Sequence, residues 1–220
     1  MEKYQILYED NHLLVVVKPA NMPVCPDSSK DEDLLTILKN YLKEKYHKPG
    51  NVYLGLIHRL DRPVTGIMVF AKTSKASERL TKQIQEKKIT KTYYAVVYGK
   101  LKNNDTLNDY LIKDEKNNTS YITTKEKGKL SILDYELIKT VDNLNLVKID
   151  LQTGRSHQIR VQFSSRNNPL YGDQKYNKNA KPNTQIALFA KELSFYHPTT
   201  NELLTFEINL PKRYPFTLFK

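Results

Sequence analysis

Residues 91–100 read K-T-Y-Y-A-V-V-Y-G-K, a stretch rich in the β-branched and aromatic side chains that favour strands. Four further strand-like segments follow, and clusters of Asn and Asp separate them. This order predicts a meander of antiparallel strands in the middle of the chain. The predicted strands are residues 110–112, 121–124, 130–138 and 144–151, and the predicted turns are residues 103–105, 114–118 and 142–143.

The chain on either side of this meander adds helices and further strands. The spacing of Leu34, Leu38 and Leu42 predicts a helix that starts at Asp31 and stops before Pro49. Residues 74–88 form a second amphipathic pattern with Ser74 as its N-cap, and residues 156–165 have the features of a short helix. The other predicted strands are residues 13–17, 54–57, 67–71, 185–190, 193–196 and 203–210.

No repeat, low-complexity run or linker interrupts these elements, so we expect one α+β domain over residues 1–220. Its mixed, mostly antiparallel sheet should be flanked by helices. Two sub-lobes that share one sheet are the alternative. The length fits either arrangement, since 220 residues make one large domain or two small ones.

The composition is that of a globular chain, with 39% hydrophobic and 27% charged residues. The single cysteine, Cys25, excludes an internal disulfide framework and a metal site made of several thiolates. No apolar run approaches the roughly 20 residues that span a bilayer, and none resembles the core of a signal peptide. We therefore expect a soluble, cytoplasmic protein.

The positive charge is concentrated in two segments. The formal net charge is +11, which indicates a polyanionic partner. Residues 72–102 carry nine basic residues against two acidic ones, and residues 152–182 carry six against one. Part of the first segment is the helix pattern at 74–88, whose solvent face should be an electropositive ridge. Its members Lys82, Lys87 and Lys88 are candidates for contacts with the backbone of a polyanion.

Several familiar sites are absent from the sequence. It contains no G-x-G-x-x-G, no G-x-x-x-x-G-K-[ST] and no G-x-S-x-G, and it has only seven glycines. The five histidines form no H-x-x-x-H pair. We therefore expect no nucleotide cofactor, no other cofactor and no metal.

One carboxylate has unusual neighbours. Asp61 stands between Arg59 and Arg62, with His58 close by, and nearby cations favour the ionised form of a carboxyl group. Such an Asp is a nucleophile or general base that faces a polyanion, or it is a surface residue that makes one ion pair. The residues themselves leave both interpretations open.

Two further clusters carry candidate residues. The run T-G-R-S-H-Q-I-R at 153–160 contains Arg155 and Arg160, which can hold a carboxylate or a phosphate, although a capped helix start explains it equally well. Tyr93 and Tyr94 should point to opposite faces of their strand, one into the core and one toward a cleft where it can stack on a base.

Taken together, these motifs resemble the RluA family of pseudouridine synthases. His58-Arg-Leu-Asp61 with Thr65-Gly66 is similar to that family's H-R-L-D signature, and Lys91-Thr-Tyr93 is similar to its K-x-Y strand. Residues 151–161 and residues 169–176 follow its L-x-T-G-R-[TS]-H-Q-I-R-V and P-I-x-G-D-x-x-Y patterns, and residues 18–24 look like its K-P-x-G-x-x-V loop. The matches run in order over nearly the whole chain.

The resemblance implies a pseudouridine synthase catalytic domain with a central RNA-binding cleft. Asp61 would be the catalytic aspartate, Tyr93 the tyrosine beside the uracil ring, and Arg160 the basic residue paired with Asp61. Arg59 would occupy the space that a flipped uridine leaves, and the other expected substrate-binding residues are His58, Thr65, Arg155 and His157. The implied partner is a stem-loop of rRNA or tRNA, bound by a monomer that needs no cofactor and has no N-terminal S4 domain.

The sequence departs from the family pattern at a few positions, and two other function classes remain alternatives. Asn21 replaces a loop glycine, Val64-Thr65-Gly66 stands where Thr-Ser-Gly is usual, and Gln162 and Asn168 stand where His is common. A non-catalytic RNA-binding protein could keep the same fold. A base-modifying transferase is the other alternative, but it would need a cofactor loop that this sequence lacks.

Overall fold

The computed structural model describes residues 4–219, and the chain divides into two compact units. The first unit holds the residues up to Thr90 together with Glu192–Ile208, and the second holds Lys91–Lys191 and the residues from Asn209 onward. The boundaries therefore fall inside two strands, β5 (Thr90–Tyr98), directly after its first residue, and β10 (Leu188–Tyr196).

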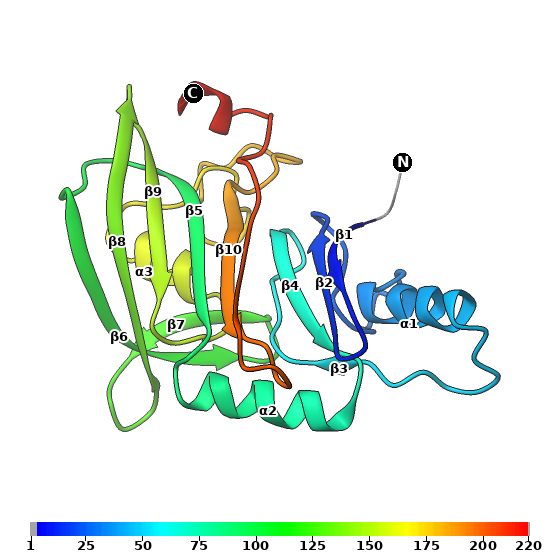
Figure 1. The fold of residues 1–220 in the computed structure, drawn as a ribbon. Coiled ribbons are helices and arrows are strands. Elements are labelled where there is room, and N and C mark those ends of the chain that lie inside the picture. Colours follow the sequence, from blue (N-terminus) through cyan, green and yellow to red (C-terminus); the bar gives the residue numbers. More distant parts are fainter. Residues whose placement is uncertain (1–3, 220) are drawn as a thin grey trace. The chain divides into compact units, whose positions relative to one another are not determined.

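Four strands from the N-terminal part build the sheet of the first unit, and β11 (Leu203–Glu207) pairs with β10. Strand β2 pairs antiparallel with both β1 and β4, and β3 pairs with β4. Two helices, α1 and α2, complete the unit (Figure 1). The bounds are β1 Gln5–Glu9, β2 Leu13–Lys18, α1 Leu34–Lys45, β3 Gly55–Leu56, β4 Thr65–Ala71 and α2 Ser74–Gln85.

The core of the first unit forms because alternate residues of neighbouring strands meet on one face of the sheet. Val15 of β2 lies opposite Val69 of β4, and both are fully buried. Leu80 of α2 and Phe195 of β10 belong to the same buried cluster. The predicted apolar stripe of α2 is therefore the face that packs.

The second unit is the predicted meander of antiparallel strands. Its order is β5-β9-β8-β6-β7, and Figure 1 shows the long strands β5, β9, β8 and β6 side by side. The helix α3 contacts β6 and β7. The bounds are β5 Thr90–Tyr98, β6 Asn104–Asp114, β7 Thr119–Thr123, β8 Lys129–Val141, β9 Leu144–Leu151, α3 Gln158–Ser164 and η1 Phe216–Phe219.

Helix α3 packs on the face of this meander that carries Tyr93. Tyr135 of β8 and Tyr93 of β5 both lie opposite Ile149 of β9, so the three residues share a face. The ring of Phe163 on α3 lies 5.3 Å from the ring of Tyr135. The short helix therefore packs on the face from which Tyr93 projects.

The α+β prediction is confirmed, but several element boundaries were wrong. Strand β1 was missed because most of its residues are only partly buried and show no apolar run. Asn104 and Asp105 belong to β6 and pair with Glu136 and Tyr135, so they do not form the predicted turn.

Other corrections concern helix and strand ends. The N-cap of α2 is Thr73, whose side chain accepts from the N–H of Ala76, and not Ser74. The predicted strand at 54–57 is reduced to Gly55–Leu56. The two strands predicted within residues 185–196 are one strand, since the polar residues Lys191 and Glu192 continue β10 without a break.

Among residues 4–219, no helix is both long and apolar enough to cross a bilayer.

Candidate active site

The Asp61 loop joins β3 to β4 and is anchored by two buried side chains. Leu60 is 7% exposed and Val64 is 2% exposed, while Arg59 and Arg62 point outward and Asp61 is half-buried. The N–H of Val64 donates to the carbonyl of Asp61 at 2.9 Å and closes the turn. Burial of the two apolar residues therefore fixes the loop that presents the carboxylate.

Lys18, the last residue of β2, is bound to this loop by a hydrogen bond. The side chain is fully buried, and its Nζ donates to the carbonyl oxygens of Pro19, Met22 and Arg62 at 2.8, 2.9 and 3.0 Å. Burial lowers the pKa of Lys18 to about 7, although the negative charge of Asp61 acts in the opposite direction. Lys18 was not predicted as a site residue, and the K-P pair of the first loop was the available signal.

Two predicted substrate-binding residues also hold the loop through backbone contacts. The Thr65 hydroxyl donates to the carbonyl of Lys18 at 2.6 Å. The Nε2 of His58 accepts from the N–H of Val69 at 3.2 Å. These contacts tie both ends of the Asp61 loop to β2 and β4, and a direct role in substrate binding stays a prediction.

Arg62 turns away toward the loop before α1. Its Nη1 donates to the Ser29 hydroxyl at 3.0 Å, and its Nη2 pairs with Asp31. Arg62, which follows Asp61 in the sequence, therefore has an acidic partner of its own in Asp31.

In the second unit, Arg160 of α3 is held by a buried carboxylate. The Nε and Nη2 of Arg160 donate to the two oxygens of Asp173 at 2.8 and 2.7 Å, and both side chains are at most 4% exposed. The Tyr176 ring lies under the guanidinium, with its centroid 5.1 Å from Cζ. Bidentate pairing fixes the plane of the guanidinium. Sequence reasoning missed Asp173 and Tyr176, although both belong to the G-D-x-x-Y pattern, and the pairing of Arg160 with Asp61 stays a prediction.

Arg155 and His157 lie directly before α3, and His157 is its N-cap residue. His157 has a left-handed backbone, and its Nδ1 lies 2.7 Å from the Tyr176 hydroxyl, which also accepts from the N–H of Ser120. Arg155 is exposed, and its Nε donates to the carbonyl of Leu130 at 3.0 Å. The structure thus brings His157, Arg160 and Tyr176 together, whereas the substrate contacts predicted for His157 and Arg155 stay predictions.

Tyr93 is the member of the tyrosine pair that faces inward. It is 7% exposed and lies on the face covered by α3, which also carries Arg160. Tyr94 projects to the other face, where the Nζ of Lys191 lies 5.4 Å from its ring. Two of the three predicted catalytic residues therefore share one side of this meander.

The predicted basic ridge, Lys82, Lys87 and Lys88, differs from the prediction in its secondary structure and in its charge. Helix α2 ends at Gln85, so Lys87 and Lys88 follow the helix, and Lys87 has a left-handed backbone at φ 56°. Lys82 and Lys88 approach Glu86 at 3.8 and 2.8 Å. Glu86 therefore partly neutralises this cluster of cations.

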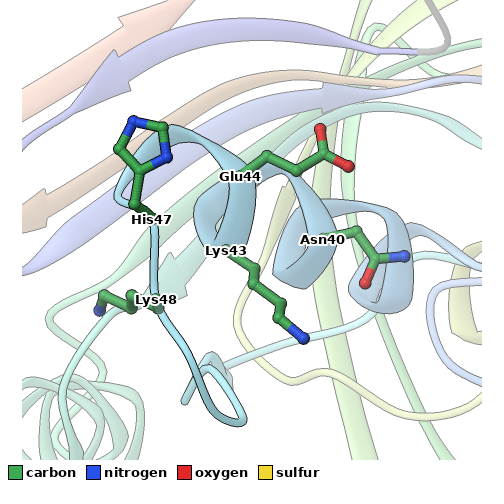
Figure 2. A pocket seen from close by; sticks show the side chains of 5 residues that line it. All are labelled: Asn40, Lys43, Glu44, His47 and Lys48. Atoms are coloured by element: carbon green, nitrogen blue, oxygen red, sulfur yellow. The ribbon is translucent and has the colours of Figure 1, made fainter.

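A separate hollow of about 420 Å³ lies in the first unit (Figure 2). It is formed by the C-terminal half of α1 and the turn that follows. None of its residues is a predicted site residue; they are Asn40, Lys43, Glu44, His47 and Lys48. In the described part of the chain, no three His, Cys, Asp or Glu side chains are grouped as a metal site would require.

Comparison with known proteins identifies the family of this chain. A family model described as RNA pseudouridylate synthase matches residues 12–165, a range that includes Asp61, Tyr93 and Arg160. The chain belongs to this family. Its members are isomerases, so the predicted RluA-type resemblance and enzyme class are confirmed.

Individual pseudouridine synthases are similar along most of the chain. An uncharacterized RNA pseudouridine synthase of Aquifex aeolicus is 32% identical over 95% of this chain and 70% of its own length. The ribosomal large subunit pseudouridine synthase D of Buchnera aphidicola is 32% identical over 94% of this chain and 69% of its own length.

A solved structure supports the fold. Human RNA Pseudouridylate Synthase Domain Containing 4 matches with a TM-score of 0.81 at 20% identity, and the match covers 98% of this chain and 92% of that chain.

Proposed function

We propose that this pseudouridine synthase isomerises one uridine in a ribosomal or transfer RNA stem-loop, with Asp61 as the catalytic carboxylate. The observation that carries the proposal is the Asp61 loop itself. Within a chain of this family, the H-R-L-D sequence is intact, and the buried Lys18 fixes the loop through the carbonyl of Arg62. The domain that performs the reaction would be residues 1–220 acting as a monomer in the cytoplasm, with the RNA in a central cleft.

The choice of RNA rests on charge and on relatives. Several similar proteins are named for the ribosomal large subunit. A strongly basic chain suits a target held by its phosphates, since neutralising phosphates releases counterions. A uridine in a loop is the easier target, because flipping a base out of its stack costs a few kcal/mol and less where pairing is already absent.

The proposed reaction breaks the N1–C1′ bond, turns the uracil and joins C5 to C1′. The C5 proton is lost at the end and N1 gains a proton, so the atoms balance without an external reactant. Asp61 either attacks the nucleotide covalently or removes the C2′ proton to give a glycal. Arg160 would compensate the charge of Asp61, Tyr93 would hold the ring, and Arg59 would occupy the vacated space in the stack.

Replacement of the proposed catalytic group tests this assignment. We expect Asp61→Asn to abolish tritium release from C5-labelled uridine in RNA while RNA binding changes by less than about two-fold, because the side chain keeps its size. Asp142→Asn is the matched control, since Asp142 lies in an exposed turn at φ 53°, where Asn is well tolerated. Turnover retained by the Asp61 variant would remove Asp61 from the mechanism.

The target uridine can be identified by mapping pseudouridines in cellular RNA. Carbodiimide-induced reverse-transcription stops in total RNA from a deletion strain should lose one or a few pseudouridines relative to the parent strain. If no site is lost and the purified protein releases no tritium, the non-catalytic RNA-binding alternative is favoured.

A further inference from the structure

Lys91 shares the face of β5 that carries Tyr93. Side chains two residues apart on a strand project to the same side, about 6.6 Å from one another along the strand. The Nζ of Lys91 lies 3.5 Å from the position that a Cβ would take on Gly154. The lysine thus reaches the T-G-R-S turn that leads into α3.

The charge of Lys91 is half-buried without compensation. Within residues 4–219, its Nζ has neither a hydrogen-bond acceptor nor an acidic partner. Burial lowers the pKa of Lys91, and no neighbouring charge opposes this effect. A cation held in this way destabilises the fold unless a ligand supplies the missing negative charge, and such an uncompensated group is a candidate for an anion-binding site.

The turn beside Lys91 offers further donors. Among the described residues, the N–H groups of Gly154 and Ser156 and the Ser156 hydroxyl have no protein acceptor. Gly154 is exposed and has no side chain to cover the turn. Arg155 lies between these residues and is exposed as well. An anion that contacted Lys91 would therefore meet several unused donors.

We infer that Lys91 and the turn at residues 154–156 bind a phosphodiester of the substrate RNA next to the target uridine. This inference rests on the proposed function, because it places the phosphate beside Tyr93. A phosphodiester suits the site, since it carries one negative charge and presents two oxygens, one for Nζ and one for the turn. Lys91 then acts on binding and not on the reacting atoms.

The experiment uses the full chain and a large-subunit rRNA transcribed in vitro. We expect Lys91→Met to raise KM about ten-fold, with kcat within about two-fold of wild type. The slope of log K against log salt in filter binding should become shallower by about 0.7 to 0.9, the loss of one phosphate contact. Lys91→Arg should keep the slope, because it keeps the charge.

Two further variants separate this role from others. Lys127→Met removes one exposed lysine from the same unit and is the matched control. Gly154→Val should raise KM in the same way, because its side chain would cover the turn, and Gly154 does not have a left-handed backbone. The melting temperature of Lys91→Met should equal or exceed that of wild type, since an uncompensated buried charge is removed.

Three results would overturn the inference. The first is a salt slope for Lys91→Met equal to that of Lys127→Met, and the second is a loss of kcat at constant KM, which would place Lys91 at the reacting atoms. The third is a lowered melting temperature of Lys91→Met, which would show a structural role.

Failure of the proposed function can be distinguished from failure of this inference. Wild type would then form no pseudouridine in any RNA, while the salt slope would still report the Lys91 contact.

Discussion

Lys18 lies in an environment that is unusual for a lysine, since its side chain is fully buried. All three hydrogens of its ammonium group meet carbonyl oxygens, and one of those carbonyls belongs to Arg62 of the Asp61 loop. A fully buried lysine is rare unless it is paired. The contacts therefore make Lys18 part of the support for Asp61.

The pH dependence of stability should report this burial. An unfolded lysine has a pKa near 10.4, whereas the pKa of Lys18 in the folded chain is about 7. Between these values the unfolded chain binds more protons, so stability rises with pH there. In urea unfolding, the free energy of wild type minus that of Lys18→Met should rise from pH 7 to 10, by at most about 1.4 kcal/mol per pH unit, and stay constant below pH 6.

Lys43→Met, which removes an exposed lysine of α1, is the control for that measurement. A difference between wild type and Lys18→Met that does not change with pH would contradict the lowered pKa.

Some individual residues of the candidate site could be located from the sequence alone. Asp61 stood out because cations flank it within four residues, so its environment is local in the chain. Asp173 lies 13 residues from Arg160, and no periodicity links a loop carboxylate to a helix. Lys91 is recognised only from burial, which a single charged residue in a strand does not predict, whereas Lys18 had the K-P pair of the first loop as its only sequence signal.

Among the elements, α1 shows how one carboxylate can anchor a helix. Glu9 of β1 accepts hydrogen bonds from the hydroxyls of Tyr41 and Tyr46 and from Lys45 and Lys72. Burial acts to raise the pKa of Glu9, but these four contacts outweigh it and lower the pKa to about 2. The strand that sequence analysis missed therefore holds the C-terminal half of α1.

Glu9→Gln should loosen this anchor. We expect the free energy of unfolding at pH 7 to fall by about 1–2 kcal/mol, a modest value because Lys45 is exposed to water. Because the folded pKa is depressed, the stabilisation is complete above about pH 4.5 and is lost as the pH falls toward 2. Glu44→Gln on the exposed side of α1 is the control, and equal losses in the two variants would contradict the anchoring role.

Elements with continuous apolar runs could be predicted, and those defined by tertiary pairing could not. β2 and β4 were found because their residues are buried on both faces. β6 begins at Asn104, where turn-forming residues enter a ladder because β8 supplies partners. Local propensity is weaker than such pairing, so strand ends depend on neighbours that are distant in sequence.

At the scale of the whole molecule, the excess of positive charge should act through specific lysines. Replacing Lys82, Lys87 and Lys88 together by Gln should weaken binding of the rRNA transcript and make its salt dependence shallower by about 1 to 2. The lower value is favoured, because Glu86 already neutralises part of this cluster. Filter binding at several KCl concentrations measures the slope.

The control for this ridge is a triple substitution of Lys125, Lys127 and Lys129 by Gln, which removes the same charge from exposed positions in the turn before β8 and at the first residue of β8. If both triple variants change the slope equally, the ridge is an ordinary solvated surface and only net charge matters.

The split of β10 between the two units has a consequence for synthesis. Leu193 and Phe195 complete a buried cluster whose other members lie within the first 90 residues of the chain. A ribosome that adds about 5–20 residues per second needs roughly 5–20 s to make the intervening hundred residues. During that interval the nascent first unit lacks part of its core and exposes apolar surface, so its folding must wait for almost the entire chain to be translated.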